Sequence, residues 1–254
     1  FFRGFCCFML LITLSGLHVV TYMIPGATRL VSFTSQLHCP SLVAQDGASS
    51  AHAFELENDA EDIKSELLEL LSEIPARGYE VAEVDAKDLV DIAEELAELV
   101  PCDGWQYSPL LAGTWRLLYT SSKAFHNNKG LIGYARDFAG ISTPELLMRV
   151  QTQFRLLTYE EPIQYEERSL LSFIGKAVQA ESIKAKCTWS VNGEGTWLVY
   201  PAEIVAGSRS WEPADRQSKA LRVLGACNPL FLDESTLVLR AQLREVLFIF
   251  ERVS

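Results

Sequence analysis

Hydrophobic residues recur with a helical period in the first strongly patterned part of the chain. In ENDAEDIKSELLELLSEIPARG the apolar side chains are spaced so that they share one face of a helix: Ile63, Leu67, Leu70, Leu71 and Ile74. Asn58 or Asp59 is suited to cap this helix, because short polar side chains accept hydrogen bonds from its first free N–H groups. Pro75 and Gly78 are expected to end it.

A second stretch, VDAKDLVDIAEELAELVP, repeats this plan. Its apolar stripe consists of Leu89, Ile92, Ala93, Leu96, Leu99 and Val100. Asp85 is a candidate N-cap, and Pro101 is expected to stop the helix. Two adjacent helices, each with one apolar and one acidic face, predict a helical hairpin packed on the domain that follows.

After Pro109 the pattern changes to strands. The segment SIKAKCTWSV alternates, so that Ile183, Cys187 and Trp189 are expected on one face. Asn192-Gly193 is a hairpin signal. We predict strands over Thr114–Thr120, Leu146–Thr158, Ser169–Ile174, Gln179–Val191, Thr196–Tyr200, Ala220–Leu224, Ser235–Arg240 and Glu245–Val253.

About eight strands joined by short turns, with no helices repeated between them, predict an antiparallel barrel or sandwich. The expected fold class is α+β, with the helical hairpin before the sheet. A long segment from Ser121 to Thr143 separates two of the predicted strands, and it is expected to be a lid, a binding loop or a helix crossing the barrel mouth.

The first 53 residues are typical of a targeting sequence. An apolar run from Phe5 to Val20 is suited to the h-region of a signal peptide, and the following Ser-, Thr- and Ala-rich segment is similar to a transit peptide. Two such signals in series resemble the bipartite presequence of algae with complex plastids. A plain secretory signal or an N-terminal anchor is the alternative. We therefore expect three parts: presequence 1–53, acidic hairpin 54–103 and β-domain 104–254.

Charge is distributed unevenly between these parts. Residues 54–103 hold 17 acidic and 3 basic residues, a net charge of −14, whereas residues 104–254 hold 15 acidic and 17 basic, a net charge of +2. The whole chain carries −11, which argues against a nucleic-acid partner. The acidic helix faces are expected to be solvated, or alternatively to dock a basic protein partner.

Motifs for metal, nucleotide or triad chemistry are missing from residues 54–254. His126 is the only histidine there, the cysteines form no CxxC pair, and neither Gly-rich phosphate motif occurs. We therefore predict no metal site and no cofactor. His126 is expected to be a solvated loop residue, and so are the acid pairs Glu160-Glu161 and Glu166-Glu167.

The run LLAGTWRLLYTSS carries the most specific signal. Gly113 and Trp115 at the start of a strand resemble the Gly-x-Trp signature of lipocalins, in which the tryptophan closes the base of the barrel under an arginine from a late strand. Arg240 or Arg252 is a candidate for that arginine, through a cation–π contact.

The longer run SPLLAGTWRLLYTSS, with FLDESTLVLRAQLREVLFIFERV near the C-terminus, resembles the plastid lipid-associated protein family, also called plastid fibrillins or plastoglobulins. Asp233, Leu239, Arg240, Leu247 and Phe248 align with the family's C-terminal pattern. The chain departs from it at residues 241–243, where the family has Arg-Gly before the last strand.

This resemblance implies a lipocalin-like barrel and a non-catalytic role in binding lipids, carotenoids or prenylquinones at plastoglobules or thylakoids. It gives Gly113, Trp115, Asp233 and Arg240 as signature positions. The predicted ligand-binding residues, taken as an apolar barrel interior, are Trp115, Leu117, Tyr119, Trp189, Phe248 and Phe250.

Two alternatives remain open. One is a scaffold for plastid enzymes that uses the acidic helices. The other is a lipocalin-type enzyme acting on carotenoids or quinones, with Glu181, Asp233 or Tyr119 as acid or base in an apolar cavity.

Overall fold

A computed structural model describes residues 10–14, 17–21, 47–138, 140–165, 180–213, 218–243 and 245–253. The chain divides into two compact units, residues 1–49 and 50–254. In the first unit, β1 (Leu10–Leu14) and β2 (Leu17–Thr21) form an antiparallel hairpin. Most of the predicted presequence lies outside the described residues, as do the predicted strand Ser169–Ile174 and the pair Glu166-Glu167.

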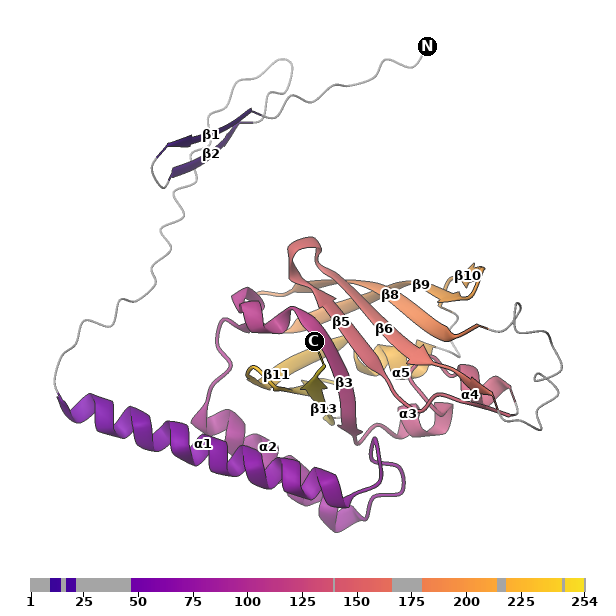
Figure 1. Ribbon diagram of the computed structural model, residues 1–254, viewed down its shortest axis with the longest axis horizontal. Coiled ribbons are helices and arrows are strands. Elements are labelled where there is room, and N and C mark those ends of the chain that lie inside the picture. The colour runs from indigo at the N-terminus through magenta and orange to yellow at the C-terminus, as the bar shows by residue number, and fades with distance from the viewer. Residues whose placement is uncertain are drawn as a thin grey trace. The chain divides into compact units, whose positions relative to one another are not determined.

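Two long helices, α1 (Gly47–Glu73) and α2 (Glu83–Leu99), lie side by side in the second unit (Figure 1). Both were predicted, but their caps differ from the prediction. Because α1 begins at Gly47, Asn58 and Asp59 lie inside it and cannot cap it. The residue before α2 is Ala82, which makes no side-chain cap, and Asp85 lies in the first turn, where the helix dipole favours an acidic side chain.

Eight antiparallel strands close into a barrel, which confirms the predicted fold class. Their order around the ring is β9-β11-β12-β13-β3-β5-β6-β8, and β8 pairs with β9 to close it. The strands are β3 (Gly113–Thr120), β5 (Leu147–Gln151), β6 (Leu156–Pro162), β8 (Ser182–Val191), β9 (Trp197–Ala206), β11 (Ala226–Leu232), β12 (Thr236–Ala241) and β13 (Val246–Arg252).

Smaller elements complete the second unit. Strand β10 (Arg209–Trp211) pairs antiparallel with the end of β9, and β4 (Ile141–Ser142) pairs with β7 (Gln164–Tyr165). Before β3 the chain makes two short 3-10 turns, η1 (Trp105–Tyr107) and η2 (Pro109–Leu111).

Three strand predictions need correction. The stretch Leu146–Thr158 is not one strand, because the 3-10 turn η3 (Thr152–Phe154) and a left-handed Arg155 separate β5 from β6. Ala220–Leu224 was predicted as a strand but lies mainly in helix α5 (Ser218–Val223). The real strand there, β11, was missed because it contains Pro229, at which the pairing with β12 shifts register.

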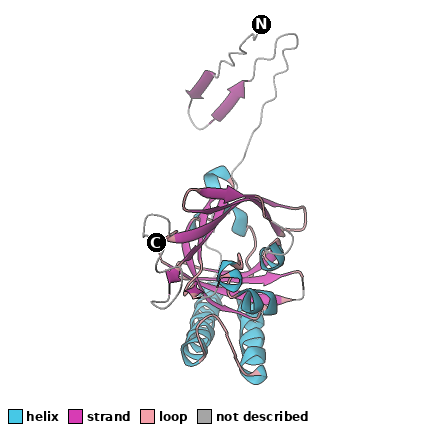
Figure 2. Ribbon diagram, turned by 90° about the vertical axis from the view of Figure 1, so that its right-hand side faces the viewer, coloured by secondary structure: helices cyan, strands magenta, loops and turns pink. Residues whose placement is uncertain are grey.

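The long segment after β3 forms two short helices, α3 (Lys123–Asn128) and α4 (Tyr134–Asp137). Ser122 caps α3 by accepting a hydrogen bond from the backbone nitrogen of Phe125. Helices α3 and α5 contact each other at one end of the barrel, the end that faces the viewer in Figure 2. This end is called the barrel mouth below.

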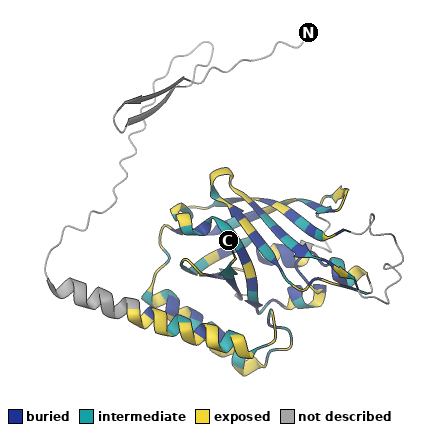
Figure 3. Ribbon diagram, in the orientation of Figure 1, coloured by how far each residue is buried: buried dark blue, intermediate teal, exposed yellow. Residues whose placement is uncertain are grey.

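The apolar residues form two separate cores. The first fills the barrel, and the second lies between the outer surface of β12 and β13 and the helical hairpin. Figure 3 shows the result as alternating buried and exposed positions along the strands and as exposed outer faces on both helices. Strand β8 follows the predicted alternation, with Ile183, Ala185, Cys187 and Trp189 all buried.

Candidate functional site: the barrel interior and its mouth

Trp115 is buried at the start of β3 and is covered by Arg252 from β13. The guanidinium carbon of Arg252 lies 4.2 Å from the Trp115 ring centroid. Arg252 also donates to the carbonyl oxygens of Ala112 and Leu110 at the strand entry, where Gly113 has a φ of 142°. Of the two arginines predicted to provide this cover, Arg252 is the one that does so.

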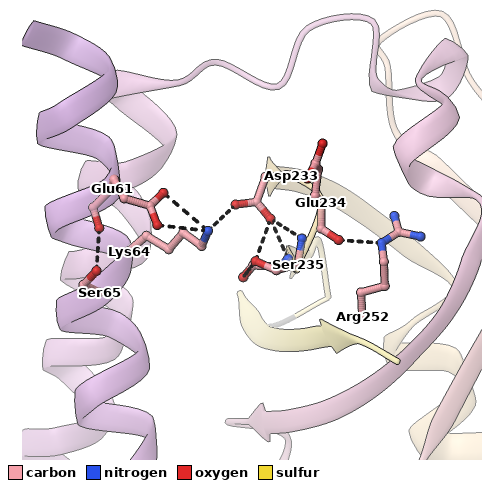
Figure 4. A network of polar contacts seen from close by, with 8 residues as sticks. Glu61, Lys64, Ser65, Asp233, Glu234, Ser235 and Arg252 are labelled. Atoms are coloured by element: carbon pink, nitrogen blue, oxygen red, sulfur yellow. Dashed lines mark hydrogen bonds and ion pairs between the residues drawn. The ribbon is translucent and has the colours of Figure 1, made fainter. Parts of the chain in front are cut away.

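The other predicted arginine, Arg240, faces the helical hairpin. It forms an ion pair with Glu94 on α2. Asp233 has a comparable position, because its Oδ2 lies 2.8 Å from Lys64 Nζ on α1 (Figure 4). Its Oδ1 accepts hydrogen bonds from the backbone nitrogens of Ser235 and Thr236. These two signature residues therefore hold the hairpin against the barrel.

Most of the predicted ligand-binding residues belong to the barrel core. Trp115, Leu117, Trp189, Phe248 and Phe250 are all buried in the first cluster. The Phe248 and Phe250 rings stack at 6.4 Å between centroids. The structure brings these five side chains into one apolar interior, and their contact with a ligand stays a prediction.

Tyr119 differs from its predicted interior position. It belongs to the second core, between the barrel and the hairpin. The cause is a register shift, in which Phe250 pairs with Leu117 but Ile249 pairs with Tyr119, so that Leu118 is an extra residue in β3. Such a bulge reverses the alternation of faces beyond it, and period-two reasoning from the sequence does not detect it.

Three tryptophans gather where β8 meets β9. Trp197 lies 5.4 Å from Trp105 and 5.9 Å from Trp189, measured between ring centroids. Trp105 donates its indole N–H to the carbonyl oxygen of Gly195. The buried indole N–H groups of Trp189 and Trp197 have no acceptor among the described residues.

A pocket of about 600 Å³ opens at the barrel mouth. Its lining residues come from the end of β3, from α3 and α5, and from the turn between β12 and β13: Ser121, Ser122, Lys123, Ala124, Lys219, Arg222, Val223, Leu243 and Val246. Val223 and Val246 also belong to the barrel core, so the apolar wall of the pocket is continuous with that core. The sequence reasoning did not find this pocket, because no motif marks it.

Glu161 is completely buried, which corrects the prediction that it is a solvated loop residue. Its Oε1 accepts a hydrogen bond of 2.5 Å from the backbone nitrogen of Leu131, and its Oε2 accepts one of 3.1 Å from Ile132. Burial raises the pKa of the Glu161 carboxyl to about 7, although these two donors and Arg77 act in the opposite direction. A signal was present in the sequence, since the buried residues Leu157, Tyr159 and Glu161 alternate along β6 with the residues between them.

His126 contacts the turn between α1 and α2, and it is not a solvated loop residue as predicted. It lies in α3, its Nε2 is 3.1 Å from the carbonyl oxygen of Arg77, and its ring packs 4.7 Å from that of Tyr79. Burial lowers the pKa of His126. The Arg77 side chain bonds to the carbonyl oxygen of Thr143, so the turn of the hairpin is tied to the segment that covers the mouth.

The proposed acid–base residues of the enzyme alternative do not meet in one cavity. Glu181 is exposed, Asp233 is paired with Lys64 at the hairpin, and Tyr119 packs against the helices. Over the described ranges, no cluster of three or more His, Cys, Asp or Glu side chains is placed to hold a metal ion. None of the described helices combines the length and apolar character needed to cross a membrane.

These features define a lipocalin-like antiparallel barrel with a helical hairpin packed on its outside. Residues 61–152 match the sequence model of the PAP_fibrillin family, which supports the resemblance to plastid lipid-associated proteins, or fibrillins. That family consists in general of non-catalytic structural proteins associated with plastids and their lipids. The matched region begins inside α1 and includes α2 and the barrel strands β3 and β5. No curated protein matches the chain, and no solved structure matches it.

Proposed function

We propose that this protein is a non-catalytic plastid protein that binds lipids or isoprenoids, such as carotenoids or prenylquinones. The observation that carries the proposal is the pocket at the barrel mouth, whose apolar wall continues into the barrel core. A volume of about 600 Å³ is in the range of small-molecule sites, which are mostly apolar with a few polar groups.

The affinity for the apolar part of such a ligand would come from the apolar surface that it buries on binding. Burial contributes ~25 cal/mol for each Å² of apolar surface removed from water, so an isoprenoid or acyl chain needs few polar contacts. Trp115, Leu117, Trp189, Phe248 and Phe250 pack tightly in the interior, so we propose that a ligand contacts the mouth pocket first and reaches these side chains only by displacing them. The unpaired indole N–H groups of Trp189 and Trp197 favour a ligand with a carbonyl oxygen, as in quinones.

The predicted presequence and the family match both support the proposed location. Residues 1–53 act as a bipartite plastid presequence, and the protein then associates peripherally with plastoglobules or thylakoids. In this proposal the working protein consists of the acidic hairpin, 54–103, and the barrel, 104–254.

The direct test is mass spectrometry of an organic extract from the protein purified out of its own plastid. A carotenoid, quinone or glycerolipid near one equivalent per chain is expected. Leu243, which is 51% exposed on the pocket wall, offers a sharper version of the test. Leu243→Asp should lower the bound ligand several-fold, while Leu156→Asp, at a similarly exposed site on β6, should not. A protein that carries no lipid from its plastid and takes up none in vitro would contradict the proposal.

A scaffold role is the second candidate, and one feature favours it. A groove of about 390 Å³ runs between α1 and α2, with five acidic side chains along it and Leu70 and Ile92 in it. A basic amphipathic segment of a plastid enzyme would fit this chemistry. The test is capture of proteins from plastid extract, in which Glu69→Lys with Asp88→Lys should abolish capture if the groove is used. Capture that survives both changes would exclude the groove.

A further inference from the structure

We infer that the protein attaches to an anionic lipid surface through three exposed apolar side chains at the end of the barrel away from the mouth: Phe154, Leu156 and Tyr200. This inference rests on the proposed function and gives the surface through which the peripheral association takes place. Phe154 is 67% exposed, Tyr200 is 51% exposed and Leu156 is 41% exposed. These three residues are called the base patch below.

The strand register brings the base patch together. Leu156 on β6 pairs with Thr188 on β8, and Thr188 pairs with Tyr200 on β9. Directly paired residues point to the same face of a sheet, and all three are exposed, so they form one row across the outer surface of the barrel. Phe154 lies two residues before Leu156, in the turn η3 that joins β5 to β6. The patch is therefore local and is not scattered over the surface.

The base patch lies at the opposite end of the barrel from the mouth pocket. Strand β3 runs toward the mouth, since it ends beside the pocket residue Ser121. Strand β5 runs antiparallel to it, and Val150 near the end of β5 pairs with Gly113 at the start of β3. The turn η3 that follows β5 is thus at the far end. A protein attached through this end keeps its mouth pocket open to solution, so lipid attachment and ligand binding are separable.

Charge favours this side of the barrel for an anionic surface. The acidic hairpin packs on the outer surface of β12 and β13, and β6 is four places from β12 in the eight-strand ring, which is directly across the barrel (Figure 1). The hairpin segment 54–103 carries a net charge of −14. The outer face of β5, β6, β8, β9 and the turn η3 with Arg155 carries four cations and two acids: Arg149, Arg155, Lys184, Lys186, Glu160 and Glu203. An anionic lipid surface therefore repels the hairpin and attracts the side that bears the base patch.

The size of the base patch favours a lipid surface over a protein partner. A stable protein interface buries ~800 Å² on each partner, whereas an aromatic side chain can bury at most about 250 Å². Two aromatic residues and one leucine that are already partly covered fall well short of such an interface. Single apolar side chains can instead insert among lipid head groups, a depth at which amphipathic aromatic rings are enriched. Arg155 is exposed beside Phe154 and adds a cation that anionic head groups attract.

The test is sedimentation of the protein, purified from its own plastid, with vesicles of phosphatidylcholine that either contain or lack phosphatidylglycerol. We expect tighter binding to the vesicles with phosphatidylglycerol, and this preference should shrink as salt is raised. Phe154→Ser should weaken the binding about ten-fold, because it removes apolar surface from the base patch without changing the charge. Phe154→Trp should retain the binding, because tryptophan also suits the membrane interface.

Matched controls separate the base patch from general stickiness. Val84 is 68% exposed but lies on α2, so Val84→Ser should leave vesicle binding unchanged. Arg155→Gln should lower the preference for phosphatidylglycerol about five-fold, whereas Lys87→Gln, at an exposed position on α2, should not. Equal losses in Phe154→Ser and Val84→Ser would overturn the inference. Vesicle binding that survives Phe154→Ser would overturn it as well.

The extraction test for bound ligand is run on the same samples, so the inference and the proposed function can fail separately. A protein that carries its lipid but binds no vesicles overturns the inference alone. A protein that binds vesicles through the base patch but carries and takes up no lipid supports the inference and contradicts the carrier role. Sedimentation velocity without lipid tests the other occupant. Self-association that Phe154→Ser abolishes would assign the base patch to a second copy of the chain and overturn the inference.

Discussion

The guanidinium carbon of Arg252, in the last strand, lies 4.2 Å from the ring centroid of Trp115, in the first barrel strand. The same side chain donates to the carbonyl oxygens of Ala112, Leu110 and Glu234, so it joins both ends of the barrel sequence. A lysine keeps the charge but lacks the planar fork that makes these contacts together.

We therefore expect Arg252→Lys to lower the free energy of unfolding by about 1–3 kcal/mol, measured by urea denaturation. Arg116→Lys is the matched control, because Arg116 pairs with Glu251 at the surface. Exposed ion pairs contribute little, so this control should change stability by less than about 0.5 kcal/mol. Equal losses in both variants would contradict a special role for Arg252.

Gly78 packs its backbone directly against Tyr119. A Cβ atom added at Gly78 would lie 2.7 Å from the Tyr119 ring, and the residue has a φ of 74°. Gly104 has a similar φ of 70° but nothing within 4 Å of such an atom. Gly104→Ala should cost about 1 kcal/mol for the left-handed backbone alone, and Gly78→Ala about 2 kcal/mol more because of the contact. Thermal or urea unfolding of the two variants measures this difference, and equal effects would disprove the close packing.

The Lys64–Asp233 pair should fasten α1 to the barrel. Asp233→Asn keeps an oxygen for the Ser235 and Thr236 nitrogens but removes the charge that Lys64 binds, so a loss of about 1–2 kcal/mol is expected in urea unfolding at pH 7. Asp91→Asn, on an exposed i,i+4 pair with Lys87, is the control and should have no measurable effect.

The same pair predicts an effect of acid. Burial raises the pKa of Asp233, but the hydrogen bonds from Lys64, Ser235 and Thr236 outweigh burial and lower it overall. A lowered pKa means that the stabilisation is present above the unfolded value of 3.8 and is lost as the pH falls through the folded value. Asp233→Asn should therefore be less sensitive to acid than the unmodified protein. If Asp233→Asn loses as much free energy of unfolding at acid pH as the unmodified protein does, the acid sensitivity does not come from Asp233.

Glu161 predicts the opposite pH dependence. Its pKa is raised from 4.5 to about 7, so the folded protein binds this proton more tightly than the unfolded chain does. The contribution of this proton to the free energy of unfolding is fully present below pH 4.5. It is lost as the pH rises through about 7, and the free energy of unfolding then falls by on the order of 3 kcal/mol. Glu161→Gln mimics the protonated carboxyl and should remove this fall between pH 5 and 8. Urea unfolding as a function of pH measures it, and parallel curves for the two proteins would refute the assignment.

Prediction from sequence worked where a local rule is obeyed along a whole element. The apolar stripes of α1 and α2 and the alternation in β8 follow from the helix and strand periods, and all three elements were predicted. Prediction failed where a single residue departs from the local pattern. Strand β11 was not predicted because it contains Pro229. The predicted strand Leu146–Thr158 is interrupted at Arg155, whose left-handed backbone conformation the hydrophobic pattern does not indicate. Glu161 was missed for a different reason, because a charged residue on a buried face contradicts its usual preference for solvent.

The sequence by itself determined the succession of hairpin and strands, the Gly113–Trp115 signature and the contrast between an acidic hairpin and a nearly neutral barrel. Only the tertiary structure decided that Arg252 covers Trp115 while Arg240 binds the hairpin, that Tyr119 faces the helices, and that three cations meet at the barrel mouth. The physical reason is that periodicity and charge are local properties of the chain. Closure of the barrel depends on register, and a single bulge at Leu118 changes which side chains meet.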